Sequence, residues 1–466
     1  MKKGKRGNLM HEVIVIGGGS GGYAAAIRAS QLGGQVALAE GSEIGGTCVN
    51  RGCIPSKIWL RGADLLRRLK AAEEFGIRAP VEAIDFNAVV ERKNGVSAEI
   101  RMGMEALLQN NGVEVVKGRA TLKSPTAVEI DGRIIETKKV VIATGSSLCL
   151  PEVSGLDEAA MTTDDVLDMT AVPVSVLVCG SGFIEVEMAY LLNTFGCNVT
   201  MAAESARILP GEDSDTSQRI AQALRENGVK IIPRAALESV KTTSGETTCV
   251  LSGPKERSLT VEKVLASKRM PNTIGLGLKK IGVALNEDKG IRVNDRLETS
   301  VEGIYAIGDA TGGSMLSHTA SSMAVFAAEN AMGANNRYPF HLIPRCLWTQ
   351  PEMGAVGLSE EDAEKKGYDV ETGVFPYAIN GLAMAHNRVD GAVKVVSDER
   401  YGEILGVHIV GSNATEIIGE AVTAMQLEAT VQELARSIRV HPTFSEAVVD
   451  AARDAGSWAL YLPRGM

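Results

Sequence analysis

The chain has 466 residues and a formal net charge of −9; this length exceeds a single hydrophobic core and predicts two to four domains. The negative charge argues against binding to nucleic acid or anionic membranes, and with 4% aromatic residues, stacking on bases is not expected as a general feature. The 50 glycines and 45% of hydrophobic residues suit an α/β protein with many tight turns and nucleotide loops.

The cysteines and the N-terminal segment indicate where the protein works. The seven cysteines are odd in number and show no framework spacing, which fits a reducing cytoplasm, one catalytic pair and otherwise buried thiols. No apolar run approaches the roughly 18 residues of a transmembrane helix. The basic segment 1–10 lacks the apolar stretch of a secretory signal. We expect a cytoplasmic protein whose native start is Met1 or Met10.

A dinucleotide-binding unit is predicted at the start of the chain. The buried strand 12–16 runs into a G-x-G-x-x-G loop and an alanine-rich helix, and a second strand, 35–39, ends at an acid. Glycines allow the tight turn and the close approach of a pyrophosphate to the helix start, and the acid binds a ribose hydroxyl. The residues expected to do this are Gly17, Gly19, Gly22 and Glu40.

Two cysteines, Cys48 and Cys53, lie in the glycine-rich segment 45–57. Residues i and i+5 of a regular helix are about 8 Å apart, more than the roughly 4.4–6.8 Å between the Cα atoms of a disulfide. A bridge therefore requires a distorted first turn, which Gly52 permits and Pro55 tolerates. A zinc half-site would need a second ligand pair, which the chain lacks. Two unrelated core cysteines are the other alternative, and we favour a redox pair.

Segment 45–57 resembles the redox-active disulfide of the FAD-dependent pyridine nucleotide–disulfide oxidoreductases, and the resemblance runs from about residue 11 to about residue 455. It implies that Cys48 exchanges with the substrate, that Cys53 lies against the flavin, and that the two form a disulfide. The FAD site that it implies comprises Gly17, Gly19, Gly22, Glu40, Gly46, Thr47, Lys57, Ala120, Thr144, Gly145, Ser146, Asp309, Met315, Leu316, Ser317 and His318.

Helices are predicted over 60–110, strands within 113–128, and a buried strand over 140–146. A second nucleotide unit follows, with a strand over 174–179, a glycine loop and a helix to about residue 195. Relatives bind NAD(P)H at this loop. The corresponding residues here are Gly180, Gly182, Ile184 and Glu204.

This second site departs from the family pattern at three positions. The third glycine is replaced by Glu185, the strand is followed by Ala203 where NAD-binding relatives carry an acid, and Lys268 stands for a glycine near the nicotinamide. A carboxylate beside a phosphate site is electrostatically unfavourable. In one hypothesis the loop has drifted, Glu204 replaces the acid and NADH still binds. In the other, Glu185 and Lys268 form an ion pair across a closed cleft.

Residues outside the glycine loops complete the expected catalytic set. The resemblance pairs Glu187 with Lys57 beside the flavin. Near the C-terminus, His441 and Glu446 match a family motif that reaches across a dimer to the partner's disulfide. A histidine takes up a proton near neutral pH, and a carboxylate fixes its tautomer. His318 is expected to be structural rather than catalytic.

We therefore predict two Rossmann-like domains and an α+β dimerisation domain, divided as 1–148 and 273–340 (FAD), 149–272 (NAD(P)-like) and 341–466 (interface). The expected protein is an FAD-containing homodimer, without a metal, that most resembles the dihydrolipoamide dehydrogenases. We expect it to oxidise a dithiol on a lipoyl-bearing protein, with NAD as acceptor. Two alternatives stay open: another electron partner replaces NAD, or the chain is a non-catalytic FAD-bound subunit of a complex.

Overall fold

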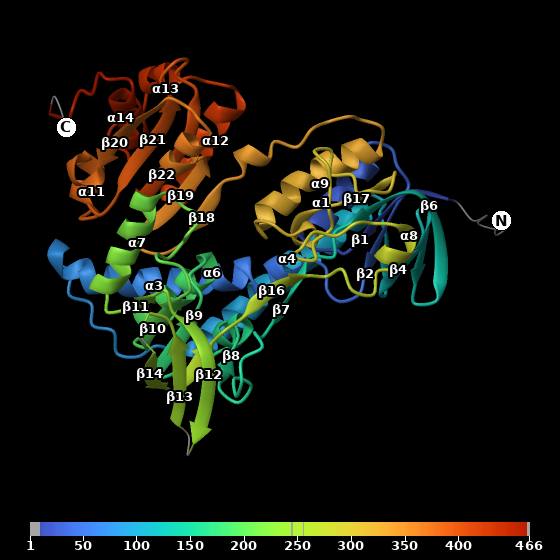
Figure 1. Cartoon of the computed structure of the whole chain (residues 1–466), viewed down its shortest axis with the longest axis horizontal. Coiled ribbons are helices and arrows are strands. Elements are labelled where there is room, and N and C mark those ends of the chain that lie inside the picture. Colours follow the sequence, from blue (N-terminus) through green and yellow to red (C-terminus); the bar gives the residue numbers. More distant parts are fainter. Residues whose placement is uncertain (1–9, 244–245, 255, 464–466) are drawn as a thin grey trace.

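The computed structural model describes residues 10–243, 246–254 and 256–463. Most of the basic segment 1–10 therefore lies outside the described residues. Figure 1 shows three lobes: one at the right, built from the start of the chain and a later return; a green one at lower left; and the C-terminal one at upper left. None of the described helices is long and apolar enough to cross a membrane.

The first lobe is built on a mainly parallel sheet in the order β3-β2-β1-β6, with β17 also beside β6 and an antiparallel extension β6-β5-β4. The return of the chain at β17 was predicted from residues 303–310 and is confirmed. The strands are β1 (His11–Ile16), β2 (Val36–Glu40), β3 (Glu114–Lys117), β4 (Ala120–Ser124), β5 (Ala127–Ile130), β6 (Arg133–Ile142) and β17 (Ile304–Ala306).

Both faces of this sheet are buried along residues 13–16 of β1, which explains why these four residues are apolar. Val13 and Val15 face a core that includes α1 (Ser20–Gln31) and α9 (Ser317–Ala331). Ile14 belongs to a second core on the other face, lined by β4 and β5. Successive residues of a strand point to opposite faces, so the doubly covered part of a strand is apolar at every position.

The second lobe holds an all-parallel sheet in the order β11-β10-β9-β15-β8. An antiparallel sheet, β12-β13-β14, packs beside it. The elements are β8 (Ala160–Met161), β9 (Ser175–Cys179), β10 (Asn198–Ala203), β11 (Lys230–Pro233), β12 (Ala236–Thr243), β13 (Glu246–Ser252), β14 (Arg257–Val261), β15 (Lys263–Leu265), α5 (Thr163–Leu167), α6 (Phe183–Thr194) and α7 (Ser214–Glu226).

Helices and a short ribbon link the two nucleotide units. Helix α3 packs against α6, and Trp59 of α3 stacks on Phe86 and meets Phe195 edge-on. The linking elements are α2 (Gly46–Arg51), α3 (Cys53–Ala71), η1 (Ala72–Phe75), α4 (Phe86–Asn110), β7 (Ser146–Cys149) and β16 (Lys268–Pro271). Two short elements, α8 (Leu278–Ile281) and η2 (Gly308–Thr311), pack within the first lobe.

The C-terminal lobe is an antiparallel sheet in the order β18-β19-β22-β21-β20, as predicted for its central strands. Lys394 of β21 ties it to α7 through ion pairs with Asp213 (3.1 Å) and Asp215 (3.0 Å). Its elements are η3 (Phe340–Leu342), β18 (Arg345–Leu347), β19 (Glu352–Gly357), α10 (Glu360–Lys365), β20 (Val370–Pro376), η4 (Tyr377–Ile379), α11 (Gly381–Ala385), β21 (Ala392–Asp398), β22 (Ile404–Gly411), α12 (Ala414–Gln426), α13 (Val431–Arg436) and α14 (Glu446–Ala455).

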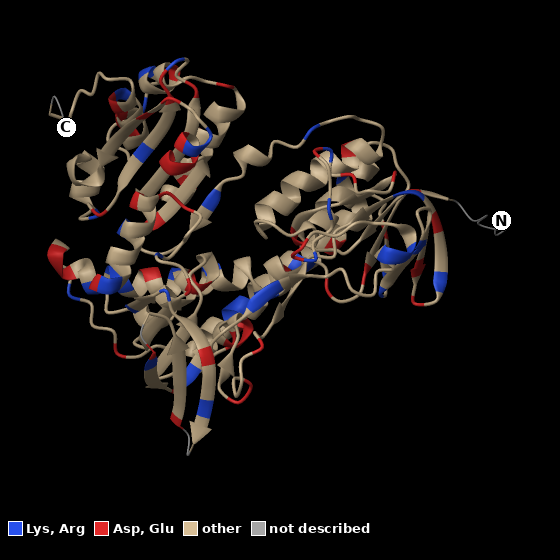
Figure 2. Cartoon of the chain, in the orientation of Figure 1, with Lys and Arg blue, Asp and Glu red and all other residues tan. Residues whose placement is uncertain are grey.

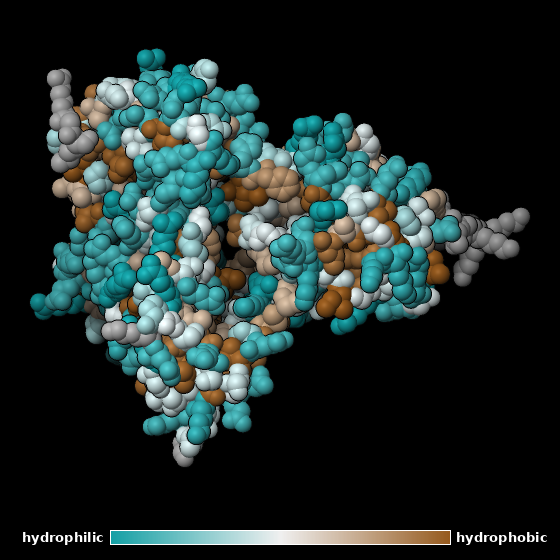
Figure 3. Space-filling view, viewed as in Figure 1, coloured by the Kyte–Doolittle hydropathy of each residue, from teal (hydrophilic) through white to brown (hydrophobic). Residues whose placement is uncertain are grey.

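The surface reflects this division. Figure 3 shows a hollow with apolar side chains where the lobes meet. On the face drawn in Figure 2, acidic and basic residues are interspersed, and the basic strand β16 crosses between the lobes. The fold class predicted from the sequence is confirmed, while the residue boundaries of the four segments stay predictions.

Candidate functional site

The loop between β1 and α1 is shaped for a phosphate group. Gly17 has a φ of +102°, and a Cβ on it would lie 2.4 Å from the Ala143 carbonyl oxygen. A Cβ on Gly22 would lie 1.7 Å from the Gly17 carbonyl oxygen. Gly19 caps α1 without a side-chain hydrogen bond, and the first turn of the helix contains no acid. The backbone N–H groups at the start of α1 are therefore free to bind an anion.

Glu40 stands at the end of β2, where the sequence predicts a ribose-binding acid. Its carboxylate accepts hydrogen bonds from the N–H of Gly18 (2.5 Å) and of Ser42 (2.6 Å). These contacts fix the carboxylate beside the glycine loop. An acid held at this place suits the ribose of a dinucleotide.

The cysteine segment lies directly on this loop. Gly45 forms a parallel bridge with Gly19, and a Cβ on Gly46 would lie 2.8 Å from the Gly19 Cα. Helix α2 ends at Gly52, whose φ of −137° and ψ of −107° are not helical, and α3 begins at Cys53. The distortion that the sequence predicts at Gly52 is confirmed.

The thiols of Cys48 and Cys53 hydrogen-bond to each other. All seven cysteines are free thiols in this structure, so the predicted Cys48–Cys53 disulfide is not formed in it, although the two side chains are adjacent. The hydrogen bond from Cys53, with smaller contributions from Ser317 and Ser20, lowers the pKa of Cys48 to about 6. The same bond and burial raise the pKa of Cys53. Cys48 is therefore the more acidic thiol of the pair.

Lys57 and Glu187 meet next to this pair, as predicted. The Lys57 ammonium lies 3.3 Å from the carboxylate of Glu187, whose side chain is 10% exposed. The same ammonium lies 3.7 Å from the centre of the Trp348 ring, and the backbone N–H of Trp348 donates to Glu187 Oε1 at 3.0 Å. Nothing in the sequence identified Trp348, because it comes from a different lobe of the chain.

A second cluster of polar side chains surrounds Asp309 of η2. Its carboxylate accepts a hydrogen bond from Ser146 Oγ at 2.5 Å, and Arg269 Nε donates to the same hydroxyl oxygen at 2.8 Å. Arg269 also reaches Thr47 Oγ1 at 3.3 Å. Sequence reasoning missed Arg269 as a site residue, although it lies within the motif that contains Lys268.

The remaining predicted FAD residues line the same region or support it. Ala120 is buried beside the turn at Gly118, and the Thr144 hydroxyl donates to the Asn272 carbonyl. His318 Nε2 lies 2.7 Å from the Pro344 carbonyl oxygen, which suits a structural role. Others surround the start of α9 or the turn after β6: Met315 (φ +47°), Leu316, Ser317 and Gly145 (φ +69°). The free loop donors, the held acid and the adjacent thiols together fit an FAD.

The second loop has the same backbone and different side chains. Gly180 has a φ of +119° and Gly182 caps α6, but Glu185 fills the space between them. Its carboxylate accepts hydrogen bonds from the backbone N–H groups of Gly182 and of Glu185 itself. The hypothesis of an ion pair with Lys268 is wrong for the described residues, because Glu185 folds back into the loop and Lys268 is exposed on β16.

The acid expected after the second strand is also displaced. The Gly180 N–H donates to the Ala202 carbonyl as the Gly17 N–H donates to that of Ala39. Ala203, buried at the end of β10, is therefore the counterpart of Glu40. Glu204 is exposed one residue later, and Ile184 is exposed on the first turn of α6.

His441 and Glu446 form a pair on the C-terminal lobe. His441 Nδ1 lies 2.9 Å from Glu446 Oε1, and the Thr443 N–H donates to Glu446 Oε2 at 2.7 Å. The His441 side chain is 78% exposed, and its Nε2 has no partner in the described part of this chain. One ring nitrogen is thus oriented while the other faces outward.

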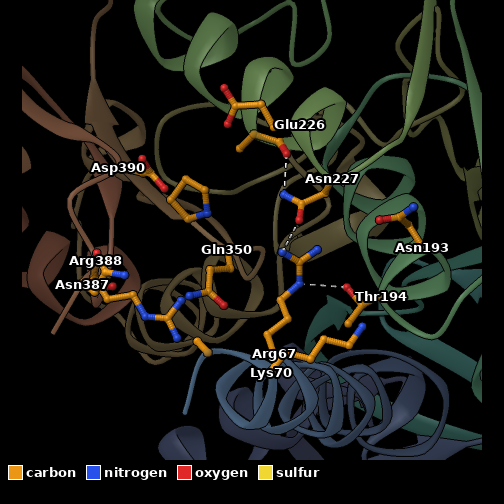
Figure 4. A pocket seen from close by; sticks show the side chains of 14 residues that line it. Arg67, Lys70, Asn193, Thr194, Glu226, Asn227, Gln350, Asn387, Arg388 and Asp390 are labelled. Carbon is orange, nitrogen blue, oxygen red and sulfur yellow. Dashed lines mark hydrogen bonds between the residues drawn. The ribbon is translucent and has the colours of Figure 1, made fainter. Parts of the chain in front are cut away.

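A cavity of about 490 Å³ lies at the far ends of α3 and α6 (Figure 4). Arg67 of α3 donates to the Thr194 hydroxyl at 3.1 Å and to the Asn227 side chain at 2.8 Å. The guanidinium thereby joins the C-terminal ends of α3, α6 and α7, where a cation is favourable. These hydrogen bonds of Arg67 hold α3, which begins at Cys53, against α6, which carries Glu185 and Glu187.

Comparison with known families gives two matches. The family described as pyridine nucleotide-disulphide oxidoreductase matches residues 11–324, and the dimerisation domain of the same family matches residues 343–452.

Individual proteins match over nearly their whole length. A dihydrolipoyl dehydrogenase of Thermus scotoductus is 37% identical over 459 residues, which cover 97% of this chain and 99% of that protein. One from Bacillus subtilis is 35% identical over 471 residues with the same coverage. Among solved structures, LpdA of Mycobacterium tuberculosis has a TM-score of 0.87 and 28% identity, covering 95% of this chain and 99% of that one. The flavoprotein disulfide reductase RclA of Escherichia coli has a TM-score of 0.84 and 26% identity, with the same coverage.

Proposed function

The chain belongs to the pyridine nucleotide-disulphide oxidoreductase family, and on that premise we propose that it is an FAD-dependent dihydrolipoamide dehydrogenase. The resemblance inferred from segment 45–57 is confirmed by these matches. The substrate is a dihydrolipoyl dithiol, and the electron acceptor is NAD. The observation that carries this proposal is the thiol pair of Cys48 and Cys53, which lies on the phosphate loop that follows β1.

The reaction begins with the oxidised pair. A thiolate of the substrate attacks Cys48 of the Cys48–Cys53 disulfide, and Cys53 leaves as a thiolate. The second substrate thiol attacks the mixed disulfide, which releases the cyclic lipoyl disulfide and the Cys48 thiolate. The substrate loses two electrons and two protons, and the cysteine pair gains the two electrons.

His441 takes one of the two protons that the substrate releases, and the other passes to the reduced cysteine pair. Its Nδ1 is held by Glu446, so that Nε2 is the nitrogen available to a thiol. Because Nε2 faces outward from this chain, we propose that it serves the cysteine pair of a second copy in a homodimer, in line with the matched dimerisation domain.

FAD, when bound, supplies two-electron transfer between the thiol pair and the nicotinamide. The loop at Gly17, Gly19 and Gly22 holds its pyrophosphate, and Glu40 holds a ribose. Asp309, with Arg269 and Ser146, lines the path between the loop and the cysteines. Lys57 and Glu187 form the charged pair beside Cys53.

The biological setting follows from the same chemistry. We propose a cytoplasmic homodimer whose partner is a lipoyl-bearing protein. The carboxyl-rich composition and net charge of −9 fit neither a nucleic acid nor an anionic membrane as partner.

Anaerobic stopped-flow mixing with dihydrolipoamide tests this function. The FAD-loaded protein should show rapid bleaching of the flavin absorbance, and Cys53→Ser should abolish it while retaining FAD. Absence of bleaching in the parent protein would refute the proposed dithiol activity. Turnover that stays at background in both the parent and Cys53→Ser would instead favour the non-catalytic subunit.

One observation favours a second candidate, in which another redox protein replaces NAD as the electron partner. Glu185 occupies the donors of the nicotinamide loop. In that case dihydrolipoamide would bleach the flavin, whereas neither NADH nor NADPH would do so in the parent protein.

A further inference from the structure

Glu185 occupies a defined position in α6. With Gly182 as the N-cap, Glu185 is the third residue of the helix, and its carboxylate returns to the N–H of Gly182 and its own N–H. A glutamate at this position can supply one half of a capping box. Burial nevertheless raises the pKa of the carboxyl group more than these N–H groups lower it. The side chain thus lies at the place of the phosphate at a cost to its ionised form, in line with the unfavourable electrostatics that the sequence predicts.

The fit of Glu185 leaves little room for a second anion. A Cβ on Gly182 would lie 2.8 Å from Glu185 Oε2, and a Cβ on Gly180 would lie 2.9 Å from Glu185 Cγ. The side chain therefore lies along the two glycines that would otherwise face a pyrophosphate. Burial raises the pKa of its carboxyl group, in agreement with its enclosed position.

The surroundings do not neutralise this carboxylate. No Lys or Arg is found among the described residues that shift the pKa of Glu185. Burial first, and then the charges of Cys249, Glu204 and Glu185, raise the pKa of the neighbouring Cys179 thiol to about 12. Two acids thus lie near Cys179 at the end of β9, where the second glycine loop begins.

We propose that Glu185 competes with the nicotinamide dinucleotide for the donors of the second loop, and so sets the affinity of this protein for NAD(H). The dinucleotide binds only when the carboxylate leaves Gly182, because one set of N–H groups cannot serve two anions. In the first loop Glu40 accepts from the N–H of Gly18 only, and the first turn of α1 carries no acid, so we expect FAD binding to be unaffected. This inference rests on the proposed function only in its assignment of the nucleotide, and it concerns the same loop in either candidate function.

Calorimetric titration with NADH, on FAD-loaded protein first fully reduced by dithionite so that NADH can transfer no electrons, tests the competition without relying on turnover. We expect Glu185→Gly to lower the Kd for NADH by at least about tenfold, a change that corresponds to ~1.4 kcal/mol. Glu185→Gln, which keeps the size but removes the charge, should give a smaller decrease and is the variant to use if the glycine variant does not fold. Glu416 is also the third residue of a helix, α12, far from the loop, so Glu416→Gly is the matched control and should leave the Kd unchanged.

The outcomes separate the two proposals. The proposed competition is overturned if the Kd for NADH is unchanged in both Glu185 variants. It is also overturned if Glu416→Gly lowers this Kd as much as Glu185→Gly does. NADH binding that is absent in the parent and appears in Glu185→Gly supports it. Reduction of the flavin by dihydrolipoamide is measured separately on the same oxidised, FAD-loaded preparations. If dihydrolipoamide does not reduce the flavin, the proposed dithiol activity is refuted, while the comparison of NADH binding still stands.

Discussion

The two glycine loops of this protein share a backbone and differ in what their side chains leave free. Gly19 and Gly182 cap their helices with φ, ψ of −70°, −173° and −79°, −174°. In the first loop a glycine, Gly22, packs against the strand turn and the helix donors are open. In the second, Glu185 stands at the corresponding position and occupies the donors. The fold is therefore preserved by backbone geometry, whereas ligand binding depends on one side chain.

The largest effect is expected from placing a side chain in the first loop. A Cβ at Gly22 would lie 1.7 Å from the Gly17 carbonyl oxygen, so Gly22→Ala must open the loop. Overpacking of this kind typically costs about 1–3 kcal/mol, and here it also displaces the phosphate donors. We expect purified Gly22→Ala to contain little or no FAD by absorbance.

Gly95 provides the control for that substitution. It lies within α4, and no heavy atom lies within 4 Å of a Cβ built on it. Gly95→Ala should retain FAD and gain about 0.5–1 kcal/mol of stability. Full FAD content in Gly22→Ala would contradict the close packing on which the contrast between the loops depends.

The next effect concerns the proton acceptor. His441→Gln should lower turnover with dihydrolipoamide by about 10²–10⁴-fold, the range for removal of a general base. The FAD content should not change, because His441 contacts Glu446 and not the FAD loop in this chain. Steady-state assays check this prediction, and turnover within twofold of the parent would exclude His441 as the base.

A third prediction uses the acidity of Cys48. Its pKa is lowered to about 6, chiefly by the hydrogen bond from Cys53, so the reduced pair carries a thiolate above that pH. Alkylation of the reduced, FAD-loaded protein by iodoacetamide should therefore rise with pH through an inflection near 6. Cys53→Ser replaces the thiol donor with a hydroxyl, and should shift this inflection. An inflection near 9 in the parent would contradict the thiolate assignment.

The sequence predicted most of this architecture and part of the site. Unbroken apolar strands, the first glycine loop and the break at Gly52 follow from local rules, and all three are present. Arg269 and Trp348 were missed because their contacts join segments more than 100 residues apart. The Glu185–Lys268 pair was wrong because charge complementarity was considered without the helix N–H groups, which are nearer to Glu185 and bind it.

The smallest effect tests the second loop in the free protein. Burial raises the pKa of Glu185 above its ordinary value, so ionisation of this carboxyl group at neutral pH lowers the stability of the folded protein. We therefore expect Glu185→Ala, without nucleotide, to have a midpoint of urea unfolding at least as high as that of the parent, and Glu416→Ala, whose carboxylate is exposed, to leave the midpoint unchanged. A clearly lower midpoint in Glu185→Ala would contradict the unfavourable enclosure of this carboxylate. If Glu185→Ala is as stable as the parent and binds NADH more tightly, both results have one cause, because the variant lacks an enclosed carboxylate at the place that the pyrophosphate takes.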